Sequence, residues 1–255
     1  MRHTRLLVAA SLTALILSLI ALLPARVAFG VLGMPVTAAT GLTGTVWSGA
    51  VQRISLGNIT LGPVLWHVRP ARLLTGQLAA EVKATVPDGF VNATVALSLG
   101  GAWSASGVEG AAPLAWLAPA MGSAGMGNAG SQLTARFDKL VVRQGRVEAA
   151  VGNLMLAGVV LPIPTTGPQL GPGTYELAFS ADELGPDDLL TGALKDAGGP
   201  LEIAGTVTIT PPRSYEVTGT AKPRAEAPSE LRTALQMLGP ATADGSHALS
   251  LAGSF

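Results

Sequence analysis

The chain has 255 residues, no cysteine, and 16 acidic residues against 16 basic ones, so its formal net charge is zero. The lack of cysteine excludes disulfides, thiol nucleophiles and thiolate metal sites, and a neutral chain without runs of like charge is not expected to bind nucleic acid. Only 13% of the residues are charged, while 32 are glycine and 18 are proline, a composition that favours short strands joined by tight turns.

The amino terminus carries an uncharged apolar stretch from Leu6 to Leu23, preceded by Arg2 and Arg5. As a helix this stretch would be about 27 Å long, close to the hydrocarbon thickness of a bilayer. By the positive-inside rule, we expect a cytoplasmic tail at residues 1–5, a transmembrane anchor at 6–24 and a domain at 35–255 on the far side of the membrane. The leucines that mark this expected anchor are Leu6, Leu12, Leu15, Leu19 and Leu23.

A cleaved signal peptide is the alternative interpretation of the same stretch. Signal peptides have an apolar region of about 7–15 residues followed by a small-x-small cleavage site. Here the apolar region is longer, and Arg26 occupies the position three residues before a cut after Ala28. The uncleaved anchor is therefore favoured, and the cleaved signal stays open.

Beyond residue 35 the hydrophobic pattern has a period of two. Gln77–Val86 alternates apolar and polar residues, and Val91–Leu99 repeats the pattern after a turn at Pro87–Gly89, which predicts a hairpin with one buried face. Such alternation is typical of antiparallel sheets that are wet on one side. The expected fold is mainly β: a curved antiparallel sheet, sandwich-like or an open groove, after a single transmembrane helix. Further strands are predicted at residues 64–68, 133–142, 146–156, 173–181, 202–210, 214–222 and 247–255.

Three short helices are predicted between the strands, at Pro113–Met121, Pro186–Leu194 and Ser229–Leu238. The second has proline at its first position and two aspartates in its first turn, and the third ends at a Gly-Pro pair. The glycine-rich segment Gly122–Gly130 predicts a flexible loop and a soft subdivision of the domain.

Residues that could support catalysis are scarce. His67 follows Trp66 in a predicted strand and is expected to face solvent. The acidic pairs Asp182–Glu183 and Asp187–Asp188 flank the helix predicted from Pro186, and we expect them to cap that helix or to be solvated. The G-x-G-x-x-G pattern at residues 125–130 lacks the preceding strand and following helix of a dinucleotide site. We therefore expect no catalytic residue, no cofactor, no metal and no enzymatic activity.

Two short motifs follow the apolar stretch. Gly44–Gly49 reads GTVWSG, and Trp66–Gly76 reads WHVRPARLLTG. The first predicts a strand with a glycine turn and Trp47 as a buried packing residue. The second predicts a strand stopped by proline, with Leu73–Leu74 packed against the sheet. The tryptophans could equally be plain core residues. The motif positions are Gly44, Val46, Trp47, Gly49, Trp66, Pro70, Leu73 and Gly76.

These motifs resemble the G-x-V-W-x-G and W-x-x-x-P-x-x-L-x-x-G elements of the type II secretion system protein N family, also called general secretion pathway protein N. Residues 215–219, 231–238 and 245–255 resemble its strand–helix–strand ending. The resemblance implies an inner-membrane accessory component with a periplasmic β-rich domain, here residues 35–255. It also implies a protein that binds other secretion components, has no catalytic residues and assists export of folded proteins. A weaker resemblance to the AsmA-like group, whose curved sheets form grooves, implies lipid as an alternative partner.

Overall fold

The computed structural model describes residues 18–19, 21–27, 39–56, 59–117, 130–159, 173–185, 187–211 and 214–254. Most of the expected anchor and most of the loop expected at residues 122–130 lie outside these ranges. Among the residues that are described, no helix has the length and apolar character needed to cross a membrane.

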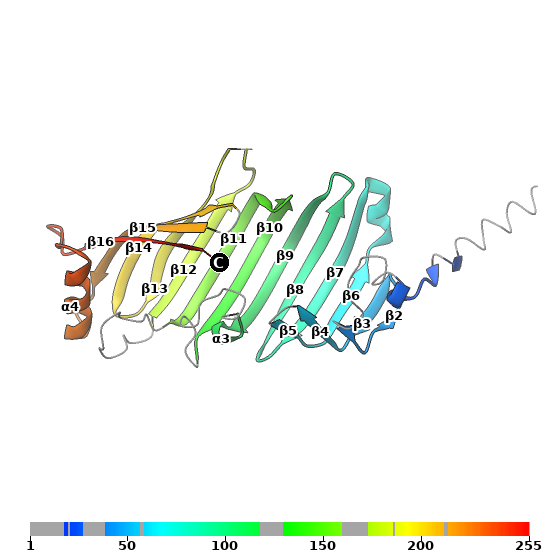
Figure 1. Cartoon of the computed structure of the whole chain (residues 1–255), viewed down its shortest axis with the longest axis horizontal. Helices are drawn as coiled ribbons and strands as arrows, with labels where there is room; N and C mark the ends of the chain where they lie inside the picture. Colours follow the sequence, from blue (N-terminus) through cyan, green and yellow to red (C-terminus); the bar gives the residue numbers. More distant parts are fainter. Residues whose placement is uncertain are drawn as a thin grey trace, which may run out of the picture.

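Thirteen strands in the described ranges form one antiparallel sheet, and from β6 onward each strand pairs with the next along the chain (Figure 1). A separate three-stranded sheet contains β1 (Ala39–Thr40), β4 (Arg53–Leu56) and β5 (Ile59–Leu61). The strands of the large sheet are β2 (Thr43–Gly44), β3 (Ser48–Val51), β6 (Val64–Val68), β7 (Gln77–Val86), β8 (Gly89–Ser98), β9 (Ala102–Pro113), β10 (Gln132–Arg143), β11 (Arg146–Val159), β12 (Gly173–Ala181), β13 (Leu190–Gly198), β14 (Leu201–Thr210), β15 (Ser214–Pro223) and β16 (His247–Ser254).

The alternating sequence pattern explains most of this sheet. All nine strands predicted from the alternation are present, as β6–β8, β10–β12 and β14–β16. The hairpin between β7 and β8 turns at Pro87–Asp88, where Asp88 adopts a positive φ of 54°. Aspartate tolerates this conformation better than most residues, so a two-residue turn forms without glycine at that position.

Strands β9 and β13 of the large sheet were not predicted, nor were β1, β4 and β5 of the small sheet. In β9, glycines at 107 and 110 interrupt the apolar alternation. The helix expected at residues 186–194 is wrong, because β13 begins at Leu190 and pairs with β12 on one side and β14 on the other. Leu190, Gly192 and Leu194 repeat with a period of two, so the strand places both leucines on the apolar face.

The helical segments are short. The 3-10 helix η2 spans Pro70–Thr75, α3 spans Leu114–Leu117, and α4 spans Ser229–Leu238 as predicted. The helix expected at residues 113–121 is described only over its first turn, and residues 118–121 lie outside the described ranges.

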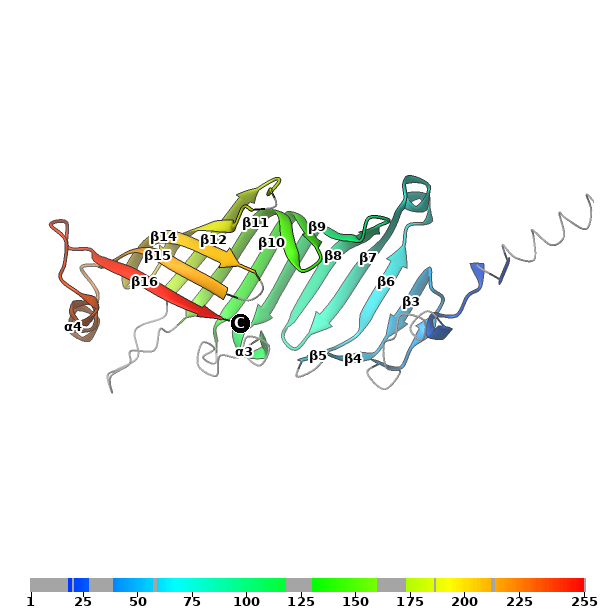
Figure 2. The ribbon, with the colours of Figure 1, turned by 45° about the horizontal axis from the view of Figure 1, so that its top comes forward.

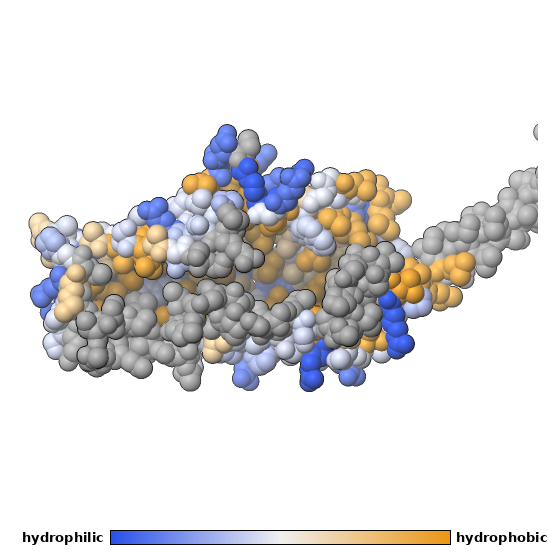
Figure 3. Space-filling view, in the orientation of Figure 1, coloured by the Kyte–Doolittle hydropathy of each residue, from blue (hydrophilic) through white to orange (hydrophobic). Residues whose placement is uncertain are grey.

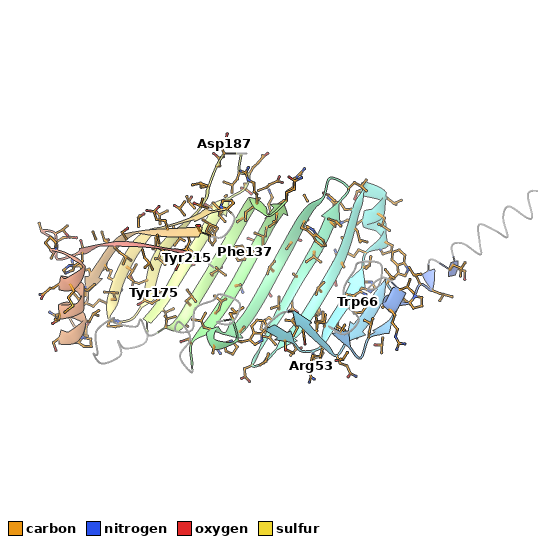
Figure 4. All side chains as sticks on the ribbon, viewed as in Figure 1. Arg53, Trp66, Phe137, Tyr175, Asp187 and Tyr215 are labelled. Carbon is orange, nitrogen blue, oxygen red and sulfur yellow. The ribbon has the colours of Figure 1, made fainter. Side chains whose placement is uncertain are left out.

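Two buried clusters hold the carboxy-terminal half together. In the first, Leu231 and Leu235 of α4 pack on Leu201 and Ile203 of β14, with Tyr175 of β12 alongside. The second surrounds Phe179 and Leu190, where the rings of Phe137 and Phe179 stack with centroids 6.1 Å apart (Figure 4). Both clusters lie on the same face of the sheet, because the register places their residues opposite one another from strand to strand.

The sheet is curved, and the described part of the chain provides no second layer of comparable size. Figures 1 and 2 show β6–β13 as a wide inclined sheet, with α4 at one end and β14–β16 curling across the neighbouring strands. Strands β4 and β5 and helix α3 lie along one rim, where the Trp116 indole donates a hydrogen bond to the Thr60 carbonyl at 3.3 Å. The architecture is therefore an open trough, not a closed sandwich.

Replacing Leu231 with alanine tests the packing of α4. Leu231 is 2% exposed, so the substitution is expected to lower the free energy of unfolding by about 2–5 kcal/mol. Met237 on the same helix is 67% exposed, and Met237→Ala serves as the control with little expected effect. Urea unfolding followed by circular dichroism measures both, and equal effects of the two variants would contradict this packing.

Candidate functional site

The apolar face of the large sheet is the most extensive surface feature of the molecule. The register places Ala80, Val95 and Ala105 opposite one another across β7, β8 and β9, and Leu140 of β10 follows. The intervening residues, such as Glu81, point to the other face, because side chains alternate along a strand. Thirteen strands at about 4.8 Å spacing make this apolar face on the order of 60 Å long.

The degree of burial varies along this face, and its β6 part is as buried as the part under α4, since Val64 and Val68 are 8% and 7% exposed. Ile203, in the α4 half, is 7% exposed. Val82, Val95 and Ala105 on β7–β9 are only partly buried. Figure 3 shows this part of the face as a hollow in which hydrophobic residues gather. We call the apolar face of β6–β10 the trough.

Exposed leucines crowd one rim of the trough. Leu74 of η2 and Leu99 of the β8–β9 turn are each 92% exposed, and their segments meet where the Leu99 N–H donates to the Gly76 carbonyl at 3.2 Å. Leu78 and Trp103, at the starts of β7 and β9, continue the patch onto the trough wall and are 46% and 56% exposed. We call Leu74, Leu78, Leu99 and Trp103 the mouth; none of them was predicted to be exposed.

The predicted packing of Leu73 and Leu74 is wrong. Leu73 and Leu74 were expected to pack against the sheet, but η2 has no buried residue, and Leu73 is 45% exposed. Pro70 opens η2, and Gly76, with φ 71°, ends it by donating its N–H to the Leu73 carbonyl. The sequence predicts a strand that stops at Pro70 and another that starts after Gly76, but it predicts no helix between them. The sequence also does not show which side of η2 faces β7.

The first motif forms a tight connection between β2 and β3. Gly44 and Gly49 pair directly across the two strands. A Cβ on Gly44 would lie 2.5 Å from the Ser48 carbonyl oxygen, and its φ of 90° also disfavours other residues. A Cβ on Gly49 would lie 2.3 Å from the ring of Trp66, so the indole lies directly over this glycine.

The two motifs contact each other through Trp66. Its indole N–H donates to the Val46 carbonyl oxygen at 3.1 Å, and the Val68 N–H donates to the Trp47 carbonyl at 2.7 Å. Trp47 itself is half-buried, not fully buried as expected. We call the unit of Gly44, Val46, Gly49 and Trp66 the clasp (Trp66 is labelled in Figure 4).

The clasp also holds the segment that follows the apolar amino-terminal stretch. The Val46 N–H donates to the Leu23 carbonyl at 3.0 Å, and Pro24 bridges to Thr45. Ala25 is 2% exposed beside them. The chain thus bonds its own β2–β3 connection, and Leu23, the last leucine of the expected anchor, lies at this end of the sheet.

The opposite edge of the sheet is β16. Ala248, Ser250, Leu251 and Ala252 are exposed, and in the described part of the chain β16 pairs with β15 alone. The strand from Ala248 to Ser254 contains neither proline nor a charged residue, the usual features that prevent an edge from pairing with another chain.

The turn before β16 is held by one carboxylate. Asp244 accepts hydrogen bonds from the Ser246 hydroxyl at 2.9 Å and the Ser246 N–H at 3.3 Å, and one from Thr242. These bonds favour the ionised form and lower the pKa of Asp244 to about 2. His247, which follows Ser246, is buried and contacts the Gly239 carbonyl oxygen through Nδ1 at 2.9 Å.

The charged residues form structural pairs. Arg69 of the second motif bonds Glu81 of β7, and this bond together with the positive charge lowers the Glu81 pKa. Arg224 pairs with Asp196, which also accepts the Ile203 N–H at 3.3 Å. His67 is exposed, as predicted. Among the described residues, no group of three or more histidine, aspartate or glutamate side chains could hold a metal ion.

The comparisons with known proteins agree with the motif resemblance. The family model of type II secretion system (T2SS), protein N, matches residues 36–250. The chain belongs to this family. It is similar to the type II secretion system protein N of Vibrio cholerae, with 28% identity over 238 residues that cover 89% of this chain and 88% of that protein. The protein of the same name from Aeromonas hydrophila is 26% identical over 217 residues, covering 84% and 82%. No solved structure matches the chain.

The clasp can be tested at Gly49. Gly49→Ala is expected to lower the free energy of unfolding by about 1–3 kcal/mol, because the added methyl collides with Trp66 and with the Thr43 carbonyl. Gly100→Ala is the control, since its nearest neighbour would be 3.7 Å from the new Cβ. Thermal unfolding of both variants measures the difference, and a Gly49→Ala protein as stable as the control would contradict the clasp.

The carboxylate before β16 predicts a dependence on pH. The Asp244 pKa is lower in the folded chain than its usual 3.8, so its contribution to stability is complete above about pH 4 and is lost as the pH falls toward 2. Asp244→Asn should therefore be less stable than the wild type at pH 7, and the two should converge as the pH falls from 4 to 2. Urea midpoints measured across this range check the convergence; a constant difference would contradict it.

Proposed function

We propose that this protein is an accessory component of the type II secretion system that acts by binding other proteins and has no catalytic activity. Membership of the type II secretion system protein N family carries this proposal. The scarcity of reactive side chains supports it, since the charged groups described above are engaged in turns and ion pairs.

We further propose that the uncharged stretch Leu6–Leu23 anchors the chain in the inner membrane, with residues 35–255 in the periplasm. The length of the stretch and the arginines before it support this orientation. The bond between Leu23 and the clasp would then hold the β2 end of the sheet close to the membrane.

The edge strand β16 is the surface we assign to a partner. An unpaired edge without charge or proline accepts an extended strand from another chain through main-chain hydrogen bonds. The β2 edge offers less, because β2 is only two residues long and Pro24 and Leu23 of the same chain already bond the residues directly after it. We therefore propose that a strand of another secretion component extends the sheet at β16.

Deletion and complementation in the bacterium that carries the protein test the function. Deletion is expected to lower the fraction of exported type II substrates in the medium and to raise the fraction retained in the periplasm. Complementation with the wild-type chain should restore secretion, and extraction of the same membranes with carbonate should leave the chain in the pellet. Secretion unchanged by deletion would contradict the proposed function.

Lysines on the edge strand test the docking surface. Ser250→Lys with Ala252→Lys charges the polar face of β16 and is expected to reduce secretion to near the deletion level while the protein still folds. Ala204→Lys with Thr206→Lys is the matched control, because both residues are exposed on the same face of β14, an interior strand. Equal secretion by the two double variants would rule out β16 as the docking edge.

A further inference from the structure

The trough wall consists of hydrocarbon with few free hydrogen-bonding groups. The main chains of β6–β9 are paired with their neighbours within the sheet, and the Trp66 indole N–H is already donated to Val46. Polar side chains of these strands, such as Glu81, lie on the other face. The wall residues are Val64, Val68, Leu78, Ala80, Val82, Ala84, Val91, Ala93, Val95, Leu97, Ala105 and Val108.

This chemistry decides which occupant fits. An extended polypeptide on the wall would bury its own N–H and C=O groups where the wall offers them no partner, which is unfavourable. An acyl chain has no polar group along its length, so it can cover the wall without such a loss. Val82, Val95 and Ala105 are only partly buried, so the central part of the wall keeps exposed apolar surface, whereas Val64 and Val68 of β6 are buried.

The mouth provides a route onto this wall. Leu74 and Leu99, each 92% exposed, stand at the rim, and Leu78 and Trp103 connect them to the wall residues Leu97 and Ala105. Figure 3 shows hydrophobic residues gathered at this rim as well as inside the hollow. A contiguous exposed apolar surface of this kind marks contact with a membrane or another apolar partner.

The position of the amino-terminal stretch favours a bilayer as the source. Leu23 is the last residue of the eighteen-residue uncharged stretch, and its carbonyl accepts the Val46 N–H next to β3. The apolar stretch therefore ends at the same end of the sheet as the trough. If that stretch lies in a bilayer, the trough is held within a short distance of phospholipid.

We infer that the trough binds the acyl chains of membrane phospholipid, which enter over the mouth and lie along the apolar faces of β6–β10. This is a second binding site, separate from the β16 edge. It does not depend on which secretion component binds that edge.

Photo-crosslinking from the two faces of the same strands tests the inference. The full chain is reconstituted in vesicles of phosphatidylethanolamine and phosphatidylglycerol, with p-benzoylphenylalanine in place of Val95 or Ala105. The matched controls carry it in place of Ala96 or Ser104, which pair with each other on the opposite face. Mass spectrometry is expected to find at least tenfold more phospholipid adduct from the Val95 and Ala105 positions.

Each remaining outcome overturns the inference. Equal phospholipid adducts from the two faces would show unspecific contact with the vesicle. Adducts from Val95 or Ala105 to a second copy, or in native membranes to another protein, would assign the trough to that partner. If a benzophenone prevents folding, the wild-type chain is labelled with a diazirine-bearing palmitic acid and digested. Label that does not concentrate on the wall residues would also contradict lipid binding in the trough.

A charge in the wall provides an independent control. Val95→Glu should reduce labelling by the diazirine palmitic acid severalfold while the circular dichroism spectrum stays native, because Val95 is only partly buried. Ala96→Glu, on the other face, should leave labelling unchanged. The secretion assay of the β16 lysine variants reads a different surface, so failure of the lipid test leaves the proposed function standing.

Discussion

An antiparallel sheet with one apolar face must cover that face, and the described residues of this chain supply little to cover it with. The large sheet has thirteen strands in the described ranges, whereas the elements on its apolar side are α3, α4 and the strands that curl at the carboxy-terminal end. Hydrophobic burial scales with the area removed from water, so the side chains under α4 form a compact core and those of β7–β9 do not. The division of the molecule into a packed half and an open half follows from this imbalance.

The two edges of the sheet also differ in how far the chain itself occupies them. At β2 the chain folds back on itself: Leu23 and Pro24 bond residues 45 and 46, and the Trp66 ring closes over Gly49. At β16 the carboxylate of Asp244 orders the preceding turn, but the strand itself presents small and uncharged residues on an exposed edge. A closed edge fixes the start of the sheet, and an open edge leaves main-chain groups available to another protein.

The two glycine and tryptophan motifs are structural in this molecule. Gly44 and Gly49 allow close approach of two strands, Trp66 packs over them, and Pro70 and Gly76 bound a 3-10 helix. None of these residues carries reactive chemistry. The surfaces that could act on other molecules are instead made by residues outside the motifs, such as Leu99, Trp103 and Ser250, and their positions depend on how the strands are arranged.

The sequence alone determined nine strands of the large sheet, their inward and outward faces, the helix α4 and the family, because a period of two and short glycine and tryptophan motifs are local properties of a chain. It missed β9, whose glycines break the alternation, and it assigned a helix to residues 186–194, where pairing on both sides of β13 outweighs a proline and two aspartates. Only the tertiary structure decided that Ile203 is covered while Val82 and Val95 line an open trough, and that Leu73 and Leu74 face water. Burial depends on what lies above a residue, and the pattern along a strand contains no information about the presence of a second layer.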